Sequence, residues 1–82
     1  MNNKELRKLF HETDATIRAG KGGIEKVLDE LKNQLREKKV VKVKLLQSAR
    51  GEKSVEELAA TLADKSGAKG YETIGNTAIF IR

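Results

Sequence analysis

The apolar residues between positions 24 and 46 change from a helical to a strand spacing, and this change constrains the fold more than any other feature. Over 24–38 they recur every three or four positions, which is typical of one buried face of an α-helix. Over 40–46 they alternate with lysines, as in a strand that buries one face. With a short strand expected at 15–18, the pattern predicts a strand–helix–strand unit with two parallel strands and a right-handed crossover.

Caps and turns define the remaining elements. Ser54-Val55-Glu56-Glu57 is a capping box, in which Ser54 caps the helix and the Glu57 side chain reaches back to the cap. Gly67 can adopt the left-handed conformation that ends this helix. Gly75-Asn76 separates two segments that we expect to be strands and predicts a two-residue hairpin turn. We therefore also expect a helix at 3–13, a loop at 47–53, and strands at 71–74 and 77–81.

This order of elements indicates an α/β domain. The sequence runs helix, strand, helix, strand, helix, strand, strand. Each of the two strand–helix–strand units implies a parallel pair of strands, and the terminal hairpin adds an antiparallel strand, which predicts a four-stranded mixed sheet with helices packed on it. The 82 residues suit a single domain spanning 1–82. The sequence does not define the face of the sheet on which the first helix packs.

The charge of the chain favours an anionic partner. The net charge is +5 and the pI is about 9.6. A nucleic acid and a membrane surface are the two candidates, and a soluble protein that is merely basic is the alternative. The apolar stripes are needed for the core, no run approaches the roughly 18 apolar residues of a membrane span, and positions 1–9 do not resemble a signal peptide. We therefore expect a cytoplasmic protein without a membrane partner.

Residues that carry out chemistry are scarce. The chain has no cysteine, and His11 is its single histidine, which excludes disulfides and the usual structural zinc sites. We find no pairing of a base with a nucleophile and no cluster of metal ligands. The sequence thus predicts a protein without enzymatic activity, cofactor, metal or small-molecule substrate.

The segment Gly20-Lys21-Gly22-Gly23 joins the first strand to the second helix. Glycines allow a backbone to approach another backbone closely, and the free N–H groups of a helix start attract anions. The Gly-x-x-Gly form resembles the loop with which KH domains clamp a nucleic-acid backbone. A tight strand-to-helix turn would use the same glycines for geometry alone, so the loop by itself leaves both interpretations open.

Three stretches in register resemble the CRM domain family, the chloroplast RNA splicing and ribosome maturation domain, whose single-domain bacterial form is YhbY-like. The first stretch resembles the family's Ile-Gly-Lys-x-Gly-Leu loop, the second its Leu-Ile-Lys-Val-Lys strand, and the third its Ile-Gly hairpin ending in Arg. These stretches are 18–24, 40–44 and 73–82. The resemblance implies a fold similar to the C-terminal domain of translation initiation factor three. It also implies RNA binding through the Gly-x-x-Gly loop and nearby basic surface. Stand-alone bacterial members associate with precursors of the large ribosomal subunit, and plant members act in group II intron splicing.

From the residues and the resemblance together we predict a protein, most simply a monomer, that binds ribosomal RNA or large-subunit precursors during ribosome assembly. With few aromatic residues, recognition should depend on phosphates more than on base stacking. An Alba-like chromatin protein and an integral ribosomal or structural component are the alternatives. The predicted RNA-binding residues are Arg18, Gly20, Lys21, Gly22, Gly23, Lys26, Lys42, Lys44, Arg50 and Lys53.

Overall fold

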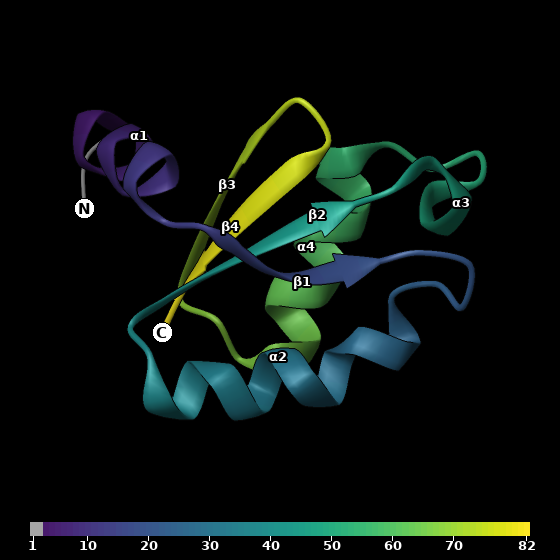
Figure 1. The fold of residues 1–82 in the computed structure, drawn as a ribbon, viewed down its shortest axis with the longest axis horizontal. Coiled ribbons are helices and arrows are strands. Elements are labelled where there is room, and N and C mark those ends of the chain that lie inside the picture. Colours follow the sequence, from purple (N-terminus) through teal and green to yellow (C-terminus); the bar gives the residue numbers. More distant parts are fainter. Residues whose placement is uncertain (1–2) are drawn as a thin grey trace.

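The computed structural model describes residues 3–82, apart from the side chains of residues 3 and 6. Its elements follow the predicted order with one addition, a short helix after the second strand (Figure 1). They are α1 (Asn3–Glu12), β1 (Ala15–Ala19), α2 (Glu25–Glu37), β2 (Val40–Leu45), α3 (Gln47–Arg50), α4 (Val55–Ser66), β3 (Gly70–Ile74) and β4 (Thr77–Ile81).

The four strands form one mixed sheet in the order β1-β2-β4-β3. β1 and β2 are parallel, as the first strand–helix–strand unit predicts, and Arg18 lies opposite Lys44 in their register. β4 is antiparallel to both of its neighbours. The parallel pair that the second strand–helix–strand unit predicts between β2 and β3 is wrong: the two strands run in the same direction, but β4 pairs with both and lies between them. The α/β class and the mixed sheet are confirmed.

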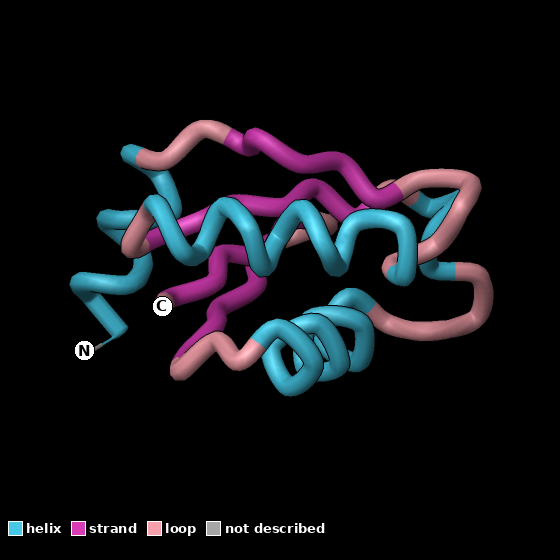
Figure 2. The backbone as a smooth tube through the Cα atoms, turned by 90° about the horizontal axis from the view of Figure 1, so that it is seen from below, coloured by secondary structure: helices cyan, strands magenta, loops and turns pink. Residues whose placement is uncertain are grey.

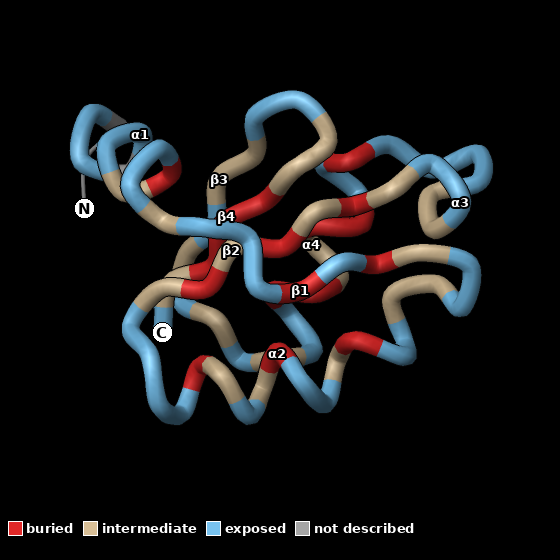
Figure 3. The backbone as a smooth tube through the Cα atoms, in the orientation of Figure 1, coloured by how far each residue is buried: buried red, intermediate tan, exposed pale blue. Residues whose placement is uncertain are grey.

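One face of the sheet and two helices enclose the main core. Val41, Val43 and Leu45 of β2 are almost fully buried there, as is Phe80 of β4. The apolar stripes of α2 and α4 complete this cluster, and the two helices contact each other, with α4 running across the direction of α2 (Figure 2). The buried positions of α2 lie on its side toward the sheet (Figure 3). Burial of this stripe against the sheet explains why the helical spacing of 24–38 holds.

α1 packs on the opposite face of the sheet. Phe10 of α1 and Ile79 of β4 are buried but lie outside the main cluster. Ile79 alternates with the core-facing Ala78 and Phe80, and its register partner is Lys42 of β2. Side chains of adjacent strand residues point to opposite faces. The sheet therefore separates α1 from α2 and α4.

The segment 47–53 differs from the predicted loop, because residues 47–50 form the helix α3. The carbonyl oxygen of Leu46 accepts hydrogen bonds from the N–H groups of Ala49 and Arg50 at 2.9 and 3.3 Å. Gly51, with φ of 59°, then ends the helix. A single turn carries no apolar period, so the sequence pattern could not reveal it.

The predicted caps and turn lie where the sequence places them. The Ser54 hydroxyl oxygen accepts a hydrogen bond from the Glu57 N–H at 3.1 Å. The reciprocal bond, in which the Glu57 carboxylate would accept from the Ser54 N–H, is not among the hydrogen bonds of residues 3–82, so only half of the predicted capping box forms. Gly67 is left-handed at φ 80°, and Gly75-Asn76 joins β3 to β4. Among the described helices, none has the length and apolar character needed to cross a membrane.

Candidate nucleic-acid interface

The segment Gly20–Gly23, the glycine loop, is a tight turn between β1 and α2. The Gly23 N–H donates a hydrogen bond to the carbonyl oxygen of Gly20 at 2.8 Å. Gly23 has φ of +75°, a conformation that other residues rarely adopt. Figure 1 shows this loop beside α3, at the end of the molecule away from both termini.

The other two glycines of the loop have different surroundings. A Cβ at Gly22 would overlap the aliphatic part of the Lys26 side chain, so this lysine lies against the loop backbone. A Cβ at Gly20 would meet Leu46 Cδ1 at 3.7 Å and Ser48 Oγ at 3.8 Å, which are ordinary contacts. Gly23 is thus the position whose backbone conformation requires glycine, and Gly22 is the position over which a lysine folds.

The start of α2 is open to an anion. Its N-cap residue is Ile24, and no side chain makes a capping hydrogen bond. The first N–H groups of a helix have no partner within the helix and carry partial positive charge. With Lys21 exposed in the adjoining turn, the glycine loop and the helix start together offer donors and charge to a phosphate.

A groove of about 500 Å³ runs beside the glycine loop, and we call it the loop groove. It lies between the start of α2, the α3 region and α4. Apolar side chains, small residues and charged side chains all contribute to its walls. The lining residues are Gly22, Gly23, Ile24, Glu25, Ala49, Arg50, Glu52, Lys53, Leu58, Thr61 and Lys65.

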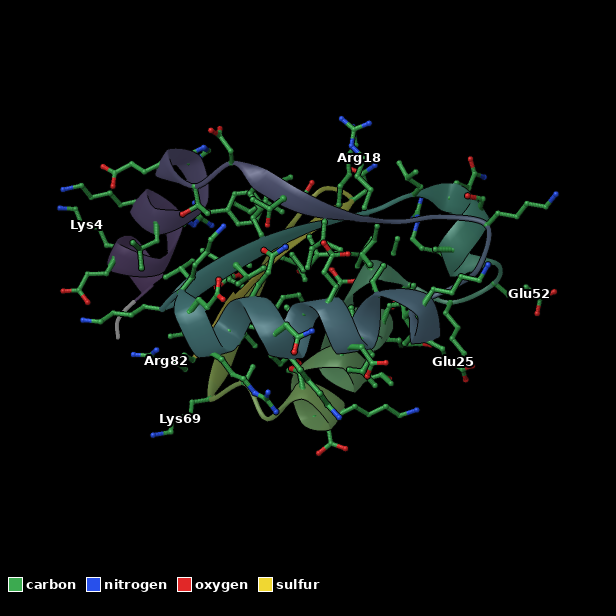
Figure 4. The ribbon with its side chains drawn as sticks, turned by 60° about the horizontal axis from the view of Figure 1, so that its bottom comes forward. Lys4, Arg18, Glu25, Glu52, Lys69 and Arg82 are labelled. Carbon is green, nitrogen blue, oxygen red and sulfur yellow. The ribbon has the colours of Figure 1, made fainter. Side chains whose placement is uncertain are left out.

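Five cations belong to the glycine loop and its groove, and we call them the loop cations. They are Lys21, Lys26, Arg50, Lys53 and Lys65. Their side chains make none of the hydrogen bonds or ion pairs found among residues 3–82. Two carboxylates, Glu25 and Glu52, lie at the same end of the molecule (Figure 4). Cations outnumber carboxylates there, so the local field favours an anion.

The fold brings four of the sequence-predicted cations together with the loop glycines: Lys21, Lys26, Arg50 and Lys53. Sequence reasoning missed Lys65, which lies in the last turn of α4 and reaches the groove only through packing of α4 beside α2. A lysine in the last turn of a helix is expected from the helix dipole alone, so the sequence around Lys65 does not indicate a binding role.

Arg18 and Lys44 form a separate pair on the sheet. They are register partners on β1 and β2 and face away from the main core. Arg18 is exposed and extends outward from β1 (Figure 4), while Lys44 is half-buried. This pair lies next to the glycine loop along β1 but on the face of the sheet that α1 shares.

Lys42 has partners within the protein. Its Nζ donates a hydrogen bond to the carbonyl oxygen of Phe10 at 2.9 Å and lies 4.3 Å from the centroid of the Phe10 ring. The structure therefore places Lys42 beneath α1, and it does not bring this residue to the glycine loop.

A second cationic cleft of about 390 Å³ lies at the other end of α2. Lys32 and Arg36 of α2 line it together with Arg82, whose Nη1 donates to the Arg36 carbonyl oxygen at 3.3 Å. This bond caps the end of α2, where cations suit the helix dipole. His11 is exposed on α1, and residues 3–82 contain no group of three or more potential metal ligands.

Fold and loop together define a small α/β domain with a glycine turn at an open helix start. The family model described as the CRS1 / YhbY (CRM) domain matches residues 1–82, and the chain belongs to this family. Among solved structures, it is similar to the solution structure of the hypothetical protein SAV1595 from Staphylococcus aureus, whose description proposes RNA binding. The two share 31% sequence identity and a TM-score of 0.76, over 96% of this chain and 81% of that chain. Comparison with curated protein sequences gave no match.

Proposed function

We propose that this chain is an RNA-binding domain without catalytic activity, and that the glycine loop and the loop cations form its interface. The observation that carries this proposal is the coincidence of a glycine turn, an uncapped helix start and five cations without partners among residues 3–82. Backbone N–H groups and mobile cations are the groups that most often contact phosphates in nucleic-acid complexes. The proposal needs no cofactor or metal.

The comparisons support RNA as the nucleic acid. The chain belongs to the CRM family, and a structurally similar protein has been described as a candidate for RNA binding. We further propose ribosomal RNA in precursors of the large subunit as the target, because the resemblance to stand-alone bacterial members implies it. Arg18 and Lys44 would extend the interface along β1 and β2 when the RNA is large enough to reach them.

Aromatic stacking contributes little to this mode of binding. Phe80 is fully buried, and Phe10 is covered by packing against the sheet. Tyr71 is the one exposed aromatic residue of the described part, and it lies on β3, at the edge of the sheet opposite β1. Proteins that read several bases by stacking present exposed aromatic residues on their binding surface. We therefore infer recognition mainly through phosphates and the shape of the RNA.

Charge reversal at Lys21 tests the proposal directly. Lys21→Glu replaces an attractive charge by a repulsive one beside the phosphate, so affinity for a fragment of large-subunit RNA should fall roughly tenfold or more at low salt. Lys69→Glu is the matched control, because it makes the same charge change on an exposed side chain at the far end of the molecule (Figure 4). The free energy of unfolding of both variants should lie within about 0.5 kcal/mol of the wild-type value.

The alternatives give different results in the same titrations. Equal losses for Lys21→Glu and Lys69→Glu would place the interface elsewhere on the protein. A preference for duplex DNA over structured RNA would favour the Alba-like alternative. Retention on mature subunits in high salt, in place of sedimentation with large-subunit precursors, would favour an integral ribosomal component.

A further inference from the structure

The loop groove has an apolar floor and a cationic rim. Leu58 is only 3% exposed, and Ile24 and Ala49 are half-buried and pack against the main core. Arg50, Lys53 and Lys65 stand around this floor, with Glu25 and Glu52 among them. A groove for phosphates alone would need no apolar floor, so the groove suits a ligand that is flat and apolar on its faces and anionic at one end.

The groove is large enough to hold a base. Its volume of about 500 Å³ lies within the range of pockets that hold small molecules, and it is lined by Gly22 and Gly23 of the glycine loop. A nucleotide whose phosphate contacts the loop can therefore reach the groove with its base. A base held within a duplex cannot enter, since its faces are stacked and its edge is paired.

Arg50 distinguishes this groove from an ordinary surface depression. Its Nε is buried and has no hydrogen-bond partner, and its guanidinium makes no ion pair within the described residues. Because the Nε has almost no accessible surface, a ligand in the groove would contact the rest of the guanidinium, whose N–H groups make no hydrogen bond within the described residues. A planar guanidinium can both stack on a base and donate to it.

We propose that the loop groove binds the base of one unpaired RNA nucleotide, while the phosphate of that nucleotide lies on the glycine loop. This inference rests on the proposed function and adds the class of RNA that the site selects: single-stranded loops, bulges or ends. The base lies on Ile24, Ala49 and Leu58, with Arg50 against its face or edge.

Three hairpin RNAs test the inference on the unmodified protein. The first is fully paired in its stem, the second has one bulged adenosine, and the third has an abasic nucleotide at the same bulge. The bulged RNA should bind at least about fivefold more tightly than the paired RNA, as expected for one additional base contact. The abasic RNA has the same phosphates but no base, so its affinity should fall back to that of the paired RNA.

Two variants locate the base contact. Ala49→Leu adds bulk to the floor of the groove and should abolish the preference for the bulged RNA over the paired RNA. Arg50→Lys keeps the charge and removes the planar guanidinium, so it should reduce the preference for the bulged RNA. It also provides the test if Ala49→Leu does not fold. Ala15→Leu, at an exposed position at the start of β1, is the control.

The outcomes separate this inference from the proposed function. If the three RNAs bind with equal affinity and Lys21→Glu lowers the affinity for all three, the proposed interface is supported and the proposal that the groove binds a base is wrong. A preference for the bulged RNA that survives both Ala49→Leu and Arg50→Lys would also overturn the groove. If none of the three RNAs binds, the proposed function itself is wrong.

Discussion

The Nζ of Lys42 lies 2.9 Å from the carbonyl oxygen of Phe10 and 4.3 Å from the centroid of the Phe10 ring. Phe10 lies in the last turn of α1, where carbonyl groups have no partner within the helix. Lys42 therefore caps α1 from the sheet, with a charge that suits the end of the helix. The contact attaches α1 to the face that α2 and α4 leave open.

We predict that Lys42 contributes to stability and that it contributes little to RNA binding. Lys42→Met keeps most of the aliphatic chain but removes the charge and the donor, so the free energy of unfolding should fall by about 1–2 kcal/mol. Affinity for RNA in the folded variant should stay within about twofold of the wild type. Urea unfolding and RNA titration on the same sample measure both quantities.

Lys44→Met is the matched control for this prediction. Lys44 lies on the same face of β2 two residues later, and its side chain makes none of the hydrogen bonds of the described residues. Its loss should change stability by less than about 0.5 kcal/mol. If Lys42→Met is as stable as the wild type but binds RNA poorly, the prediction is wrong and Lys42 belongs to the RNA-binding surface.

Salt should weaken RNA binding strongly. If about four phosphates are neutralised by the loop cations, the logarithm of the binding constant should fall with the logarithm of salt concentration with a slope near −3 to −4. Removing one of these contacts in Lys53→Met should make the slope shallower by roughly one unit. A slope close to zero for the wild type would contradict a phosphate-based interface.

The glycine loop should respond differently to alanine at its two ends. Gly23→Ala forces a side chain into a backbone with φ of +75°, which should cost about 1 kcal/mol or more. Gly20→Ala meets only ordinary contacts with Leu46 and Ser48, so its free energy of unfolding should change by less than about 0.5 kcal/mol. Thermal or urea unfolding of the two variants measures both changes in stability. Equal losses of stability in the two variants would mean that the turn does not have the geometry described here.

Most of the fold could be predicted because local patterns and global packing agree. The helical spacing before position 38, the alternation around Val43, the Ser54 cap and the Gly75-Asn76 turn each carry a physical signal that needs no tertiary information. α3 carries no such signal, because one helical turn has no period. The place of β4 between β2 and β3 depends on which strand of the hairpin pairs with β2. β4 is buried on both faces, and its nearly continuous apolar run at 78–81 agrees with a central strand.

The candidate site could be predicted only in part, for a similar reason. The glycine loop is contiguous in the sequence, so its geometry and its neighbours Lys21 and Lys26 could be recognised together. Lys65 joins them across the fold, and alternation along β2 could not distinguish the half-buried Lys42, which α1 covers, from Lys44. The loop groove depends on the packing of α2, α3 and α4, which no segment specifies alone.

The carboxylates of the loop groove should oppose RNA binding. Glu52 is exposed after α3 and lines the groove, where it repels a phosphate held by the glycine loop. At a separation of about 8 Å in water, two unit charges interact by about 0.5 kcal/mol, so Glu52→Gln should raise affinity for RNA about twofold at low salt. The gain should disappear at high salt, because exposed charges are screened.

Glu37→Gln removes the same charge from an exposed position at the far end of α2, so it separates this local effect from the change in net charge. Its affinity for RNA should rise by less than that of Glu52→Gln in parallel titrations at low and high salt. Equal gains for the two variants would mean that the RNA responds to the overall charge of the protein. A loss of affinity in Glu52→Gln would mean instead that this carboxylate accepts a hydrogen bond from the RNA, and it would assign Glu52 to the interface as a positive contributor.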